Sequence, residues 1–360
     1  MVLRWILSRW VRAALWIRFR QIRIVYHAPV PLDGAAILAG NHQNAILDSL
    51  TLASCSPKTP YTLSRAALFN NRLAGAFLKS LHMLPIYRFR DGFGKMRRNT
   101  EIFQQFVEVL RSDGWLLMFP EGSHYLRYTL RPFQKGIARI ALAAQDAQSW
   151  EKEIPILPVG LQYESHTTFG SRLLIQFGPP VSTLAFKALH SRNPREAEGA
   201  LTEKVFDELR RLLILPPPEE ERYESAVQRW NLNRARFRDL MEQFRADQEV
   251  LAGEVDPPAR PGPGKNGLRK LAGYALSFPG VILHLPVILV TLALEKAFVP
   301  DIHLGPAARF AAGMFLVPLW WVGAIGVLFS QVGFFPWALG ALALMPLSLW
   351  LWSRCWHWTR

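Results

Sequence analysis

The sequence predicts an α/β domain followed by helices that embed in a membrane. Between about residues 30 and 185, short apolar runs alternate with amphipathic stretches, which is the pattern of strands and helices around one sheet. Near the C-terminus, the blocks 271–294 and 310–353 contain no Lys, Arg, Asp or Glu. Apolar blocks of this kind are typical of segments that lie in lipid.

The elements of the α/β region follow from their apolar runs and their length. Runs of four to nine residues rich in Leu, Ile and Val indicate strands, and longer stretches with apolar residues on one face indicate helices. The expected strands are 35–39, 81–87, 116–119, 154–162 and 173–177, and the expected helices are 101–111 and 137–145.

The composition limits the classes of protein that this chain can be. Half of its 360 residues are hydrophobic, which excludes a disordered chain, and two cysteines exclude a disulfide framework or a multi-cysteine zinc site. The formal net charge of +14 indicates an anionic partner, either nucleic acid or an anionic membrane surface.

The first 26 residues favour the membrane. They carry no acidic residue and no known nucleic-acid-reading module, and tryptophans alternate with arginines at helical spacing. This is typical of a basic amphipathic helix, 1–26, in the headgroup layer of an anionic leaflet, although a basic surface helix without a membrane role stays possible. We therefore expect membrane lipids, and no nucleic acid, as partners. The arginines are Arg4, Arg9, Arg12, Arg18, Arg20 and Arg23, and the tryptophans are Trp5, Trp10 and Trp16.

The C-terminal blocks predict two kinds of membrane segment. The block 310–353 is about twice the ~20 residues that a spanning helix needs, so a transmembrane hairpin is expected over 308–353. Pro279 and Pro286 interrupt the segment 271–300, which favours a re-entrant or interfacial path that keeps the flanking basic residues on the cytoplasmic side. A charged helical extension, 191–255, and a Pro- and Gly-rich linker, 256–270, precede it.

One cluster of residues suggests chemistry. Asn41 and His42 directly follow the apolar run 35–39, and Asp48 comes six residues after His42. Histidine is the natural general base near neutral pH, and a carboxylate can orient it and stabilise its protonated form. Taken alone, this pair is weak evidence, and a loop histidine beside an aspartate that caps the next helix is the simpler interpretation.

Four further blocks follow in order: 84–88 with Arg88, the Phe-Pro-Glu-Gly-Ser run at 119–123, 133–136 with Lys135, and 157–160. Together with the His42–Asp48 block they resemble the glycerol-phosphate and lysophosphatidate acyltransferase family of the PlsC type, over about residues 20–185. The resemblance implies an acyltransferase-type catalytic domain at 27–190, with a mixed central sheet and flanking helices.

The resemblance also implies a mechanism. His42, oriented by Asp48, would accept the proton of a glycerol hydroxyl as that hydroxyl attacks an acyl thioester directly, without an acyl-enzyme. Acyl-CoA or acyl-carrier protein would be the co-substrate, with no metal and no cofactor. The acceptor would be glycerol-3-phosphate, lysophosphatidate or another lysophospholipid. The residues implied to bind it are Arg65, Arg88, Glu121, Gly122 and Ser123, with Asn41 and Lys135 as further candidates.

The spacing departs from the usual family pattern. Five residues separate His42 from Asp48, where the family usually has four, and a subgroup that resembles fungal glycerol-3-phosphate acyltransferases has the longer spacing. A six-residue offset turns a side chain by about 120° on a helix, so the pair can meet only if the turn before the helix takes up the extra residue. The alternatives are a non-catalytic lipid-binding protein or a thioester hydrolase on the same pair. The sequence does not indicate an oligomeric state.

Overall fold

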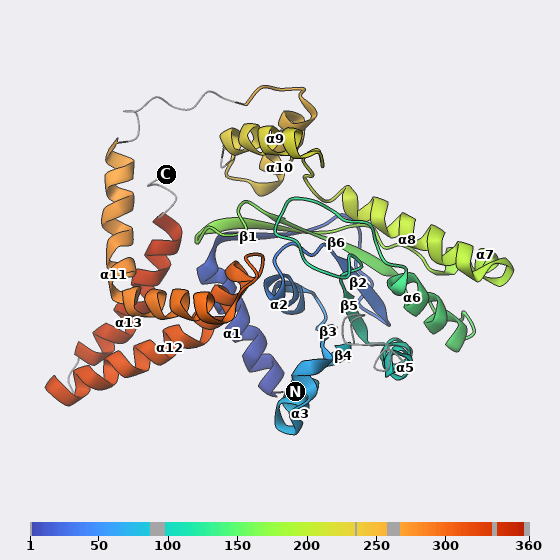
Figure 1. Cartoon of the computed structure of the whole chain (residues 1–360), viewed down its shortest axis with the longest axis horizontal. Coiled ribbons are helices and arrows are strands. Elements are labelled where there is room, and N and C mark those ends of the chain that lie inside the picture. Colours follow the sequence, from blue (N-terminus) through green and yellow to red (C-terminus); the bar gives the residue numbers. More distant parts are fainter. Residues whose placement is uncertain (1, 87–97, 235, 258–266, 333–336, 356–360) are drawn as a thin grey trace.

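The computed structural model describes residues 2–86, 98–234, 236–257, 267–332 and 337–355. Within these residues, one seven-stranded sheet is covered by helices on both faces, and three long helices lie together at one end (Figure 1). The α/β class predicted from the sequence is confirmed.

The sheet is mixed, as expected. Its strands lie in the order β1-β7-β6-β2-β5-β3-β4. Every neighbouring pair is parallel except β6 and β7, which are antiparallel. The strands are β1 Phe19–Tyr26, β2 Ala36–Gly40, β3 Tyr61–Arg65, β4 Met83–Ile86, β5 Trp115–Met118, β6 Ile156–Tyr163 and β7 Ser171–Phe177.

The helices form two layers and a C-terminal group. One face of the sheet packs on α1, α2, α9, α10 and the start of α12, and the other face packs on α5, α6 and α8. The helices of the domain are α1 Val2–Arg18, α2 Ile46–Cys55, α3 Arg72–Ser80, α5 Arg98–Arg111, α6 Gly136–Ala147, α7 Lys187–Arg192, α8 Pro194–Arg210, α9 Glu220–Asn233 and α10 Leu240–Ala252.

Strand β2 lies at the centre of this arrangement because both of its faces are buried. Ala36 and Leu38 point into the core beneath α1 and α2, while Ile37 and Ala39 point into the core beneath α5 and α6. Successive side chains of a strand face opposite sides, so a strand covered on both sides must be apolar throughout. This is why the run was recognisable in the sequence.

The structure corrects two predicted boundaries. The N-terminal helix ends at Arg18, and residues 19–26, expected to be helical, form β1 instead, which pairs with β7 at the sheet edge. The domain also extends beyond residue 190, because Ala197, Leu201 and Val205 of α8 are fully buried against the sheet. These three residues recur every fourth position and so lie on one face of the helix.

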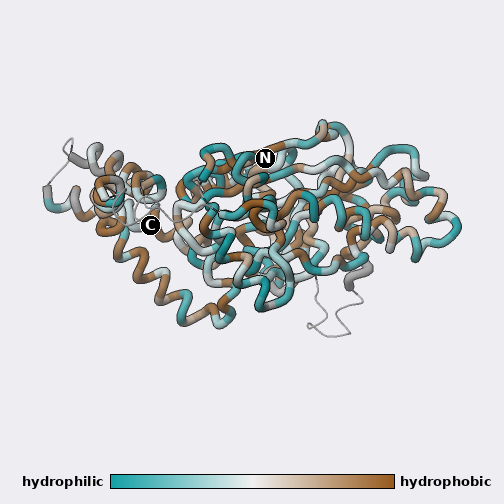
Figure 2. The backbone as a smooth tube through the Cα atoms, turned by 90° about the horizontal axis from the view of Figure 1, so that it is seen from above, coloured by the Kyte–Doolittle hydropathy of each residue, from teal (hydrophilic) through white to brown (hydrophobic). Residues whose placement is uncertain are grey.

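The C-terminal helices are α11 Gly267–Phe298, α12 Gly305–Val332 and α13 Trp337–Cys355. Among the described residues, α11 and α12 are long and apolar enough to cross a membrane. Figure 2 shows long hydrophobic stretches in this part of the molecule. Helix α11 contains Pro279 and Pro286, and Figure 1 shows it as two arms that meet at a bend, as expected where proline removes a helical hydrogen bond. Residues 258–266 of the linker lie outside the described residues.

Candidate active site

The predicted site residues gather at one edge of the sheet. Strands β2, β5, β3 and β4 run parallel to one another, so their carboxyl ends meet at the same edge. His42 lies two residues beyond the end of β2, and Glu121 lies three residues beyond the end of the neighbouring strand β5. Sites of α/β proteins commonly lie at this edge.

A tight turn brings His42 and Asp48 together. Leu47 N–H donates to the Asn44 carbonyl at 3.0 Å, and Ala45, inside this turn, has φ 47° and ψ −126°. These angles are those of the second position of a type II′ turn. The turn takes up the extra residue, α2 begins at Ile46, and His42 Nδ1 lies 3.0 Å from Asp48 Oδ2.

The Asp48 carboxylate is fully buried and held on both oxygens. Oδ2 also accepts the Asn44 N–H at 2.7 Å, and Oδ1 accepts the Tyr163 hydroxyl at 2.7 Å. Burial, and next the negative charge of Asp48, raise the pKa of Tyr163 well above its usual value, so that this hydroxyl remains a donor. With Nδ1–H donated to Asp48, the base of the His42 ring is Nε2.

Glu121 fastens two loops of the site together. Its Oε1 accepts the His42 N–H at 2.7 Å, and its Oε2 accepts the Arg131 N–H at 3.1 Å. Burial raises the pKa of Glu121, although both backbone donors and the Arg131 charge oppose that rise. Glu121 therefore positions His42 through the main chain.

Aromatic rings enclose the His42 imidazole. The Phe119 ring stacks on it with 4.1 Å between ring centroids, and the His124 ring meets it edge-on at 5.7 Å. Gly40 makes room for this arrangement, since a Cβ there would lie only 3.0 Å from the Phe119 ring.

Most of the other predicted site residues shape or fasten the loops around His42. Gly122, with φ +74°, closes the turn after Phe119, and Ser123 Oγ accepts a hydrogen bond from Arg131 Nη1 at 2.9 Å. The Asn41 side chain bonds both backbone groups of Leu161, so it fastens the loop to β6. The backbone of Arg65 ends β3 at the site edge.

One predicted site residue, Lys135, lies away from His42, and the side chains of two others are not described by the structure. Lys135 is exposed, and its Nζ lies beside Gly199 of α8, so the structure does not bring it to His42. Arg88, together with the Arg65 side chain, lies outside the described residues.

Arg131 is a site residue that sequence reasoning missed. Its guanidinium donates to Ser123, and its Nε lies 3.4 Å from Glu121 Oε2. Its Nη2 is buried and has no hydrogen-bond partner in the described part of the chain. The only sequence signal was its position two residues before the 133–136 block.

The site provides His42 as a base, Asp48 as its hydrogen-bond partner, and Arg131 as a nearby cation. Among the described residues, no group of three or more His, Cys, Asp or Glu side chains could hold a metal ion. A histidine–carboxylate pair that is open at Nε2 can take a proton from a hydroxyl nucleophile.

Comparison with known proteins finds similarity to acyltransferases. Residues 21–162 match the model of the Acyltransferase family. Glycerol-3-phosphate O-acyltransferase 2 of Saccharomyces cerevisiae is 32% identical over 112 residues, which are 31% of this chain and 15% of that protein. Glycerol-3-phosphate O-acyltransferase 1 of the same yeast is 28% identical over 102 residues, or 28% of this chain and 13% of that protein.

A solved structure is also similar: the 1-acyl-sn-glycerophosphate (LPA) acyltransferase PlsC of Thermotoga maritima. The TM-score is 0.42 at 17% identity, over 57% of this chain and 77% of that one. This likeness is too low to support a functional comparison.

The family match and the site coincide in the chain. The matched segment, residues 21–162, contains the His42–Asp48 pair and the Glu121 block. The chain spans only a small part of the length of the two yeast relatives.

Proposed function

We propose that this protein is a membrane-bound O-acyltransferase of phospholipid biosynthesis. It would move a fatty acyl group from acyl-CoA or acyl-carrier protein to a hydroxyl of glycerol-3-phosphate or lysophosphatidate. The observation that carries the proposal is the 3.0 Å contact of His42 with Asp48 at the sheet edge of an acyltransferase-family domain.

The proposed step uses the residues as the geometry arranges them. Nε2 of His42 takes the proton of the acceptor hydroxyl as its oxygen attacks the thioester carbonyl, and Asp48 stabilises the imidazolium. The carbon–sulfur bond then breaks, and the proton passes to the leaving thiolate. Arg131, with Arg65 and Arg88, is proposed to bind the acceptor phosphate, since a guanidinium matches phosphate oxygens well.

The location of the protein is part of the proposal. The exposed Trp5, Arg9 and Arg12 of α1 would lie in the headgroup layer of the cytoplasmic leaflet, and the C-terminal helices would hold the domain there. Both substrates are anionic, and a long-chain product belongs in the bilayer, so a basic domain at this surface suits the reaction.

The test is thiol release by the purified full chain, with each acyl donor paired with glycerol-3-phosphate, lysophosphatidate or another lysophospholipid. His42→Ala should abolish release. His190→Ala is the matched control, because His190 also pairs with an aspartate, Asp146, at 2.9 Å, but on the surface away from the site. No release with any pairing, or full activity in His42→Ala, contradicts the proposal.

Product analysis separates the two alternatives. Free fatty acid formed independently of acceptor would identify a thioester hydrolase on the same pair. A non-catalytic lipid-binding protein would be favoured by a His42–Asp48 pair beyond hydrogen-bond reach together with no pocket at 119–123. The first of these two conditions is not met, since the pair lies at 3.0 Å.

A further inference from the structure

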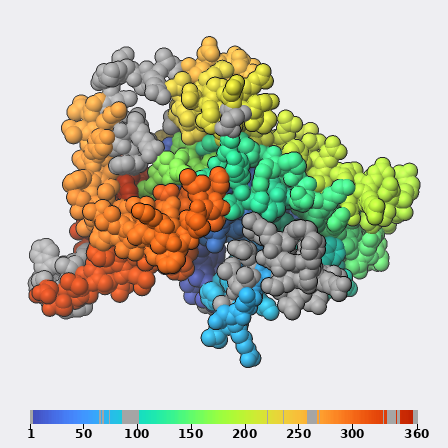
Figure 3. All heavy atoms as spheres, viewed as in Figure 1, coloured from blue at the N-terminus to red at the C-terminus, as the bar shows by residue number. Residues whose placement is uncertain are grey.

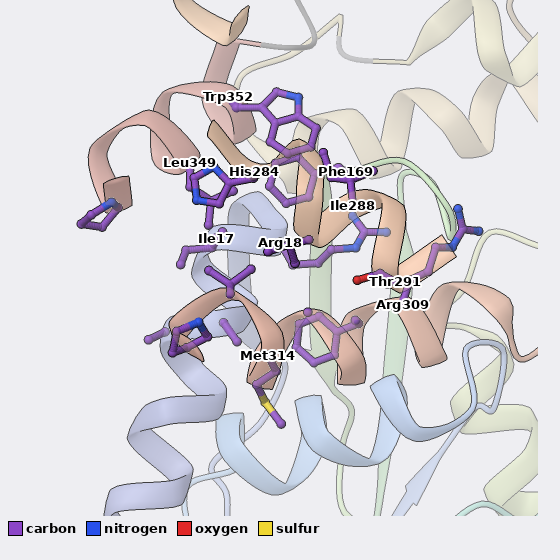
Figure 4. A pocket seen from close by; sticks show the side chains of 18 of the residues that line it. Ile17, Arg18, Phe169, His284, Ile288, Thr291, Arg309, Met314, Leu349 and Trp352 are labelled. Atoms are coloured by element: carbon purple, nitrogen blue, oxygen red, sulfur yellow. The ribbon is translucent and has the colours of Figure 1, made fainter. Parts of the chain in front are cut away.

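An apolar cavity lies between the domain and the C-terminal helices. Helices α1, α11, α12 and α13 and the loop after β6 surround it, and its volume is about 570 Å³. Ligand pockets are commonly about 300–1,000 Å³. Its walls are mainly apolar and include Ile17, Phe169, Ile288, Met314 and Leu349 (Figure 4).

The polar side chains of the cavity include Arg18, Thr291 and Arg309, which lie toward one side in Figure 4. Arg309 already has a carboxylate partner, Glu295, at 3.1 Å. Arg18 is 93% buried and donates to backbone carbonyls, including that of His166 at 3.1 Å. In the described residues, no carboxylate lies within ion-pair distance of Arg18.

A buried guanidinium without a counter-charge is costly. Here it lies beside a cavity that is otherwise apolar. This combination fits an amphiphile with an anionic group and a long apolar chain. The anionic group would lie against Arg18 and the chain would fill the cavity.

The surroundings indicate where such a ligand would come from. Two of the lining helices, α11 and α12, are those long and apolar enough to cross a membrane. Trp10 and Leu292 line the cavity and are also exposed, so the cavity reaches the molecular surface. Neither His42 nor Asp48 lines it, so the cavity lies apart from the reacting pair.

We propose that the cavity binds one acyl chain of an anionic membrane phospholipid, with the lipid phosphate against Arg18. The site is separate from the substrate site and does not depend on the proposed activity. It is nevertheless linked to the catalytic turn, because the His166 carbonyl accepts hydrogen bonds from both Arg18 and the Asn44 side chain, each at 3.1 Å.

The test uses the full chain in vesicles that contain phosphatidylglycerol with a photoreactive acyl chain. Wild-type protein should be labelled on peptides of α1 and α12. Gly313 lines the cavity, and a Cβ there would meet no atom within 4 Å, so Gly313→Leu should fill the space and lower labelling by roughly tenfold. Gly323 lies on the same helix with equally open space but outside the cavity, so Gly323→Leu should leave labelling unchanged.

Two further measurements address the headgroup and the ligand. Arg18→Gln should lower the preference for phosphatidylglycerol over phosphatidylcholine by about tenfold. Equal labelling of the two glycine variants, or no headgroup preference in wild type, would overturn the proposal. Displacement of the probe by long-chain acyl-CoA would also overturn it, because the cavity would then hold the acyl donor.

Discussion

The turn at Ala45 joins the catalytic pair, and it does so with an unfavourable backbone conformation. An L-residue at φ 47° and ψ −126° is strained by roughly 1–3 kcal/mol, whereas glycine adopts these angles freely. We expect Ala45→Gly to raise the free energy of unfolding by about 1 kcal/mol, after the entropy cost of glycine, and to keep activity. Thermal unfolding in detergent measures this.

The matched control for Ala45 lies in the same helix. Ala53 of α2 lies inside the helix, so Ala53→Gly should lower stability by about 1 kcal/mol. If both glycine variants lose stability equally, the turn is not strained.

Arg131 tests how the acceptor is bound. Lysine keeps the charge beside Glu121 but loses the forked donors, so Arg131→Lys should raise KM for the phosphorylated acceptor about tenfold and change kcat less. Steady-state kinetics with a varied acceptor measures both constants. Arg139→Gln, which removes an exposed arginine paired with Glu198, is the control and should change neither. An unchanged KM in Arg131→Lys would assign Arg131 a purely structural role.

His166 makes the domain sensitive to acid. Burial, and next the charges of Arg234 and Arg18, lower the pKa of His166 to about 3. Between about pH 6.5 and that value the unfolded chain binds a proton that the native state does not, so stability is lost as the pH falls, by up to about 1.4 kcal/mol per unit. His166→Gln should flatten this slope in unfolding curves from pH 7 to 4. An unchanged slope would show that His166 does not cause the loss of stability in acid.

At the scale of elements, burial explains which parts of the fold the sequence predicted. β2, β5 and β6 are buried on both faces, so their apolar runs are continuous and visible. β1 is an edge strand with arginines among its apolar residues, and it follows a basic helix directly, so it was mistaken for part of that helix.

The residues of the site were likewise only partly predictable from the sequence. His42 and Asp48 were predictable because their residue types and order carry the chemistry. Arg131 was not, because its place beside Glu121 exists only after the 121–131 loop folds back.

Helix α9 has a role that its charged sequence did not show. Tyr128 donates its N–H to the Tyr223 hydroxyl at 3.1 Å and packs against Trp230. Helix α9 therefore holds the segment that carries Arg131. Trp230 is 2% exposed, so Trp230→Ala should destabilise the protein by about 3–5 kcal/mol.

Hydrogen exchange measures the local effect of Trp230→Ala, and exchange within 125–131 should become faster. Trp5→Ala is the control, since Trp5 is exposed on α1, and it should leave exchange in this segment unchanged. Unchanged exchange in both variants would show that α9 does not hold the segment.

At the scale of the whole molecule, the ends of the C-terminal helices bear on their path through the membrane. His303, in the α11–α12 connector, contacts Tyr125 beside the site, with 4.9 Å between rings. Figure 3 shows the orange atoms of this region against the teal atoms of the domain. The other end of α11 follows a charged linker from α10, and a charged linker does not cross the hydrocarbon core.

The end of α13 returns to the domain as well. Arg354 donates to the Phe19 carbonyl at 2.7 Å, and its guanidinium lies over the Trp16 ring. Among the described residues, α11 and α12 are the candidate spans by length and apolarity. The contacts at the helix ends instead favour α12 and α13 as the hairpin and α11 as a re-entrant segment. The start of α11, the α11–α12 connector and the end of α13 would then all lie on the side of the domain.

Cysteine labelling tests this path in a Cys55→Ser, Cys355→Ser background. Leu268, Ile302 and Ser191 are exposed at the start of α11, in the α11–α12 connector and on α7 of the domain. Single cysteines at these positions in proteoliposomes should react with a membrane-impermeant maleimide from one and the same side.

Gln331, near the far end of α12, should lie on the opposite side of the membrane from these three positions. Gln331→Cys should react only from the other side, because α12 carries the chain across about 30 Å of hydrocarbon. If Leu268→Cys instead reacts from the side of Gln331→Cys, then α11 crosses the membrane. The α11–α12 connector, whose His303 contacts Tyr125, would then mark the end of α11 that lies on the side of the domain.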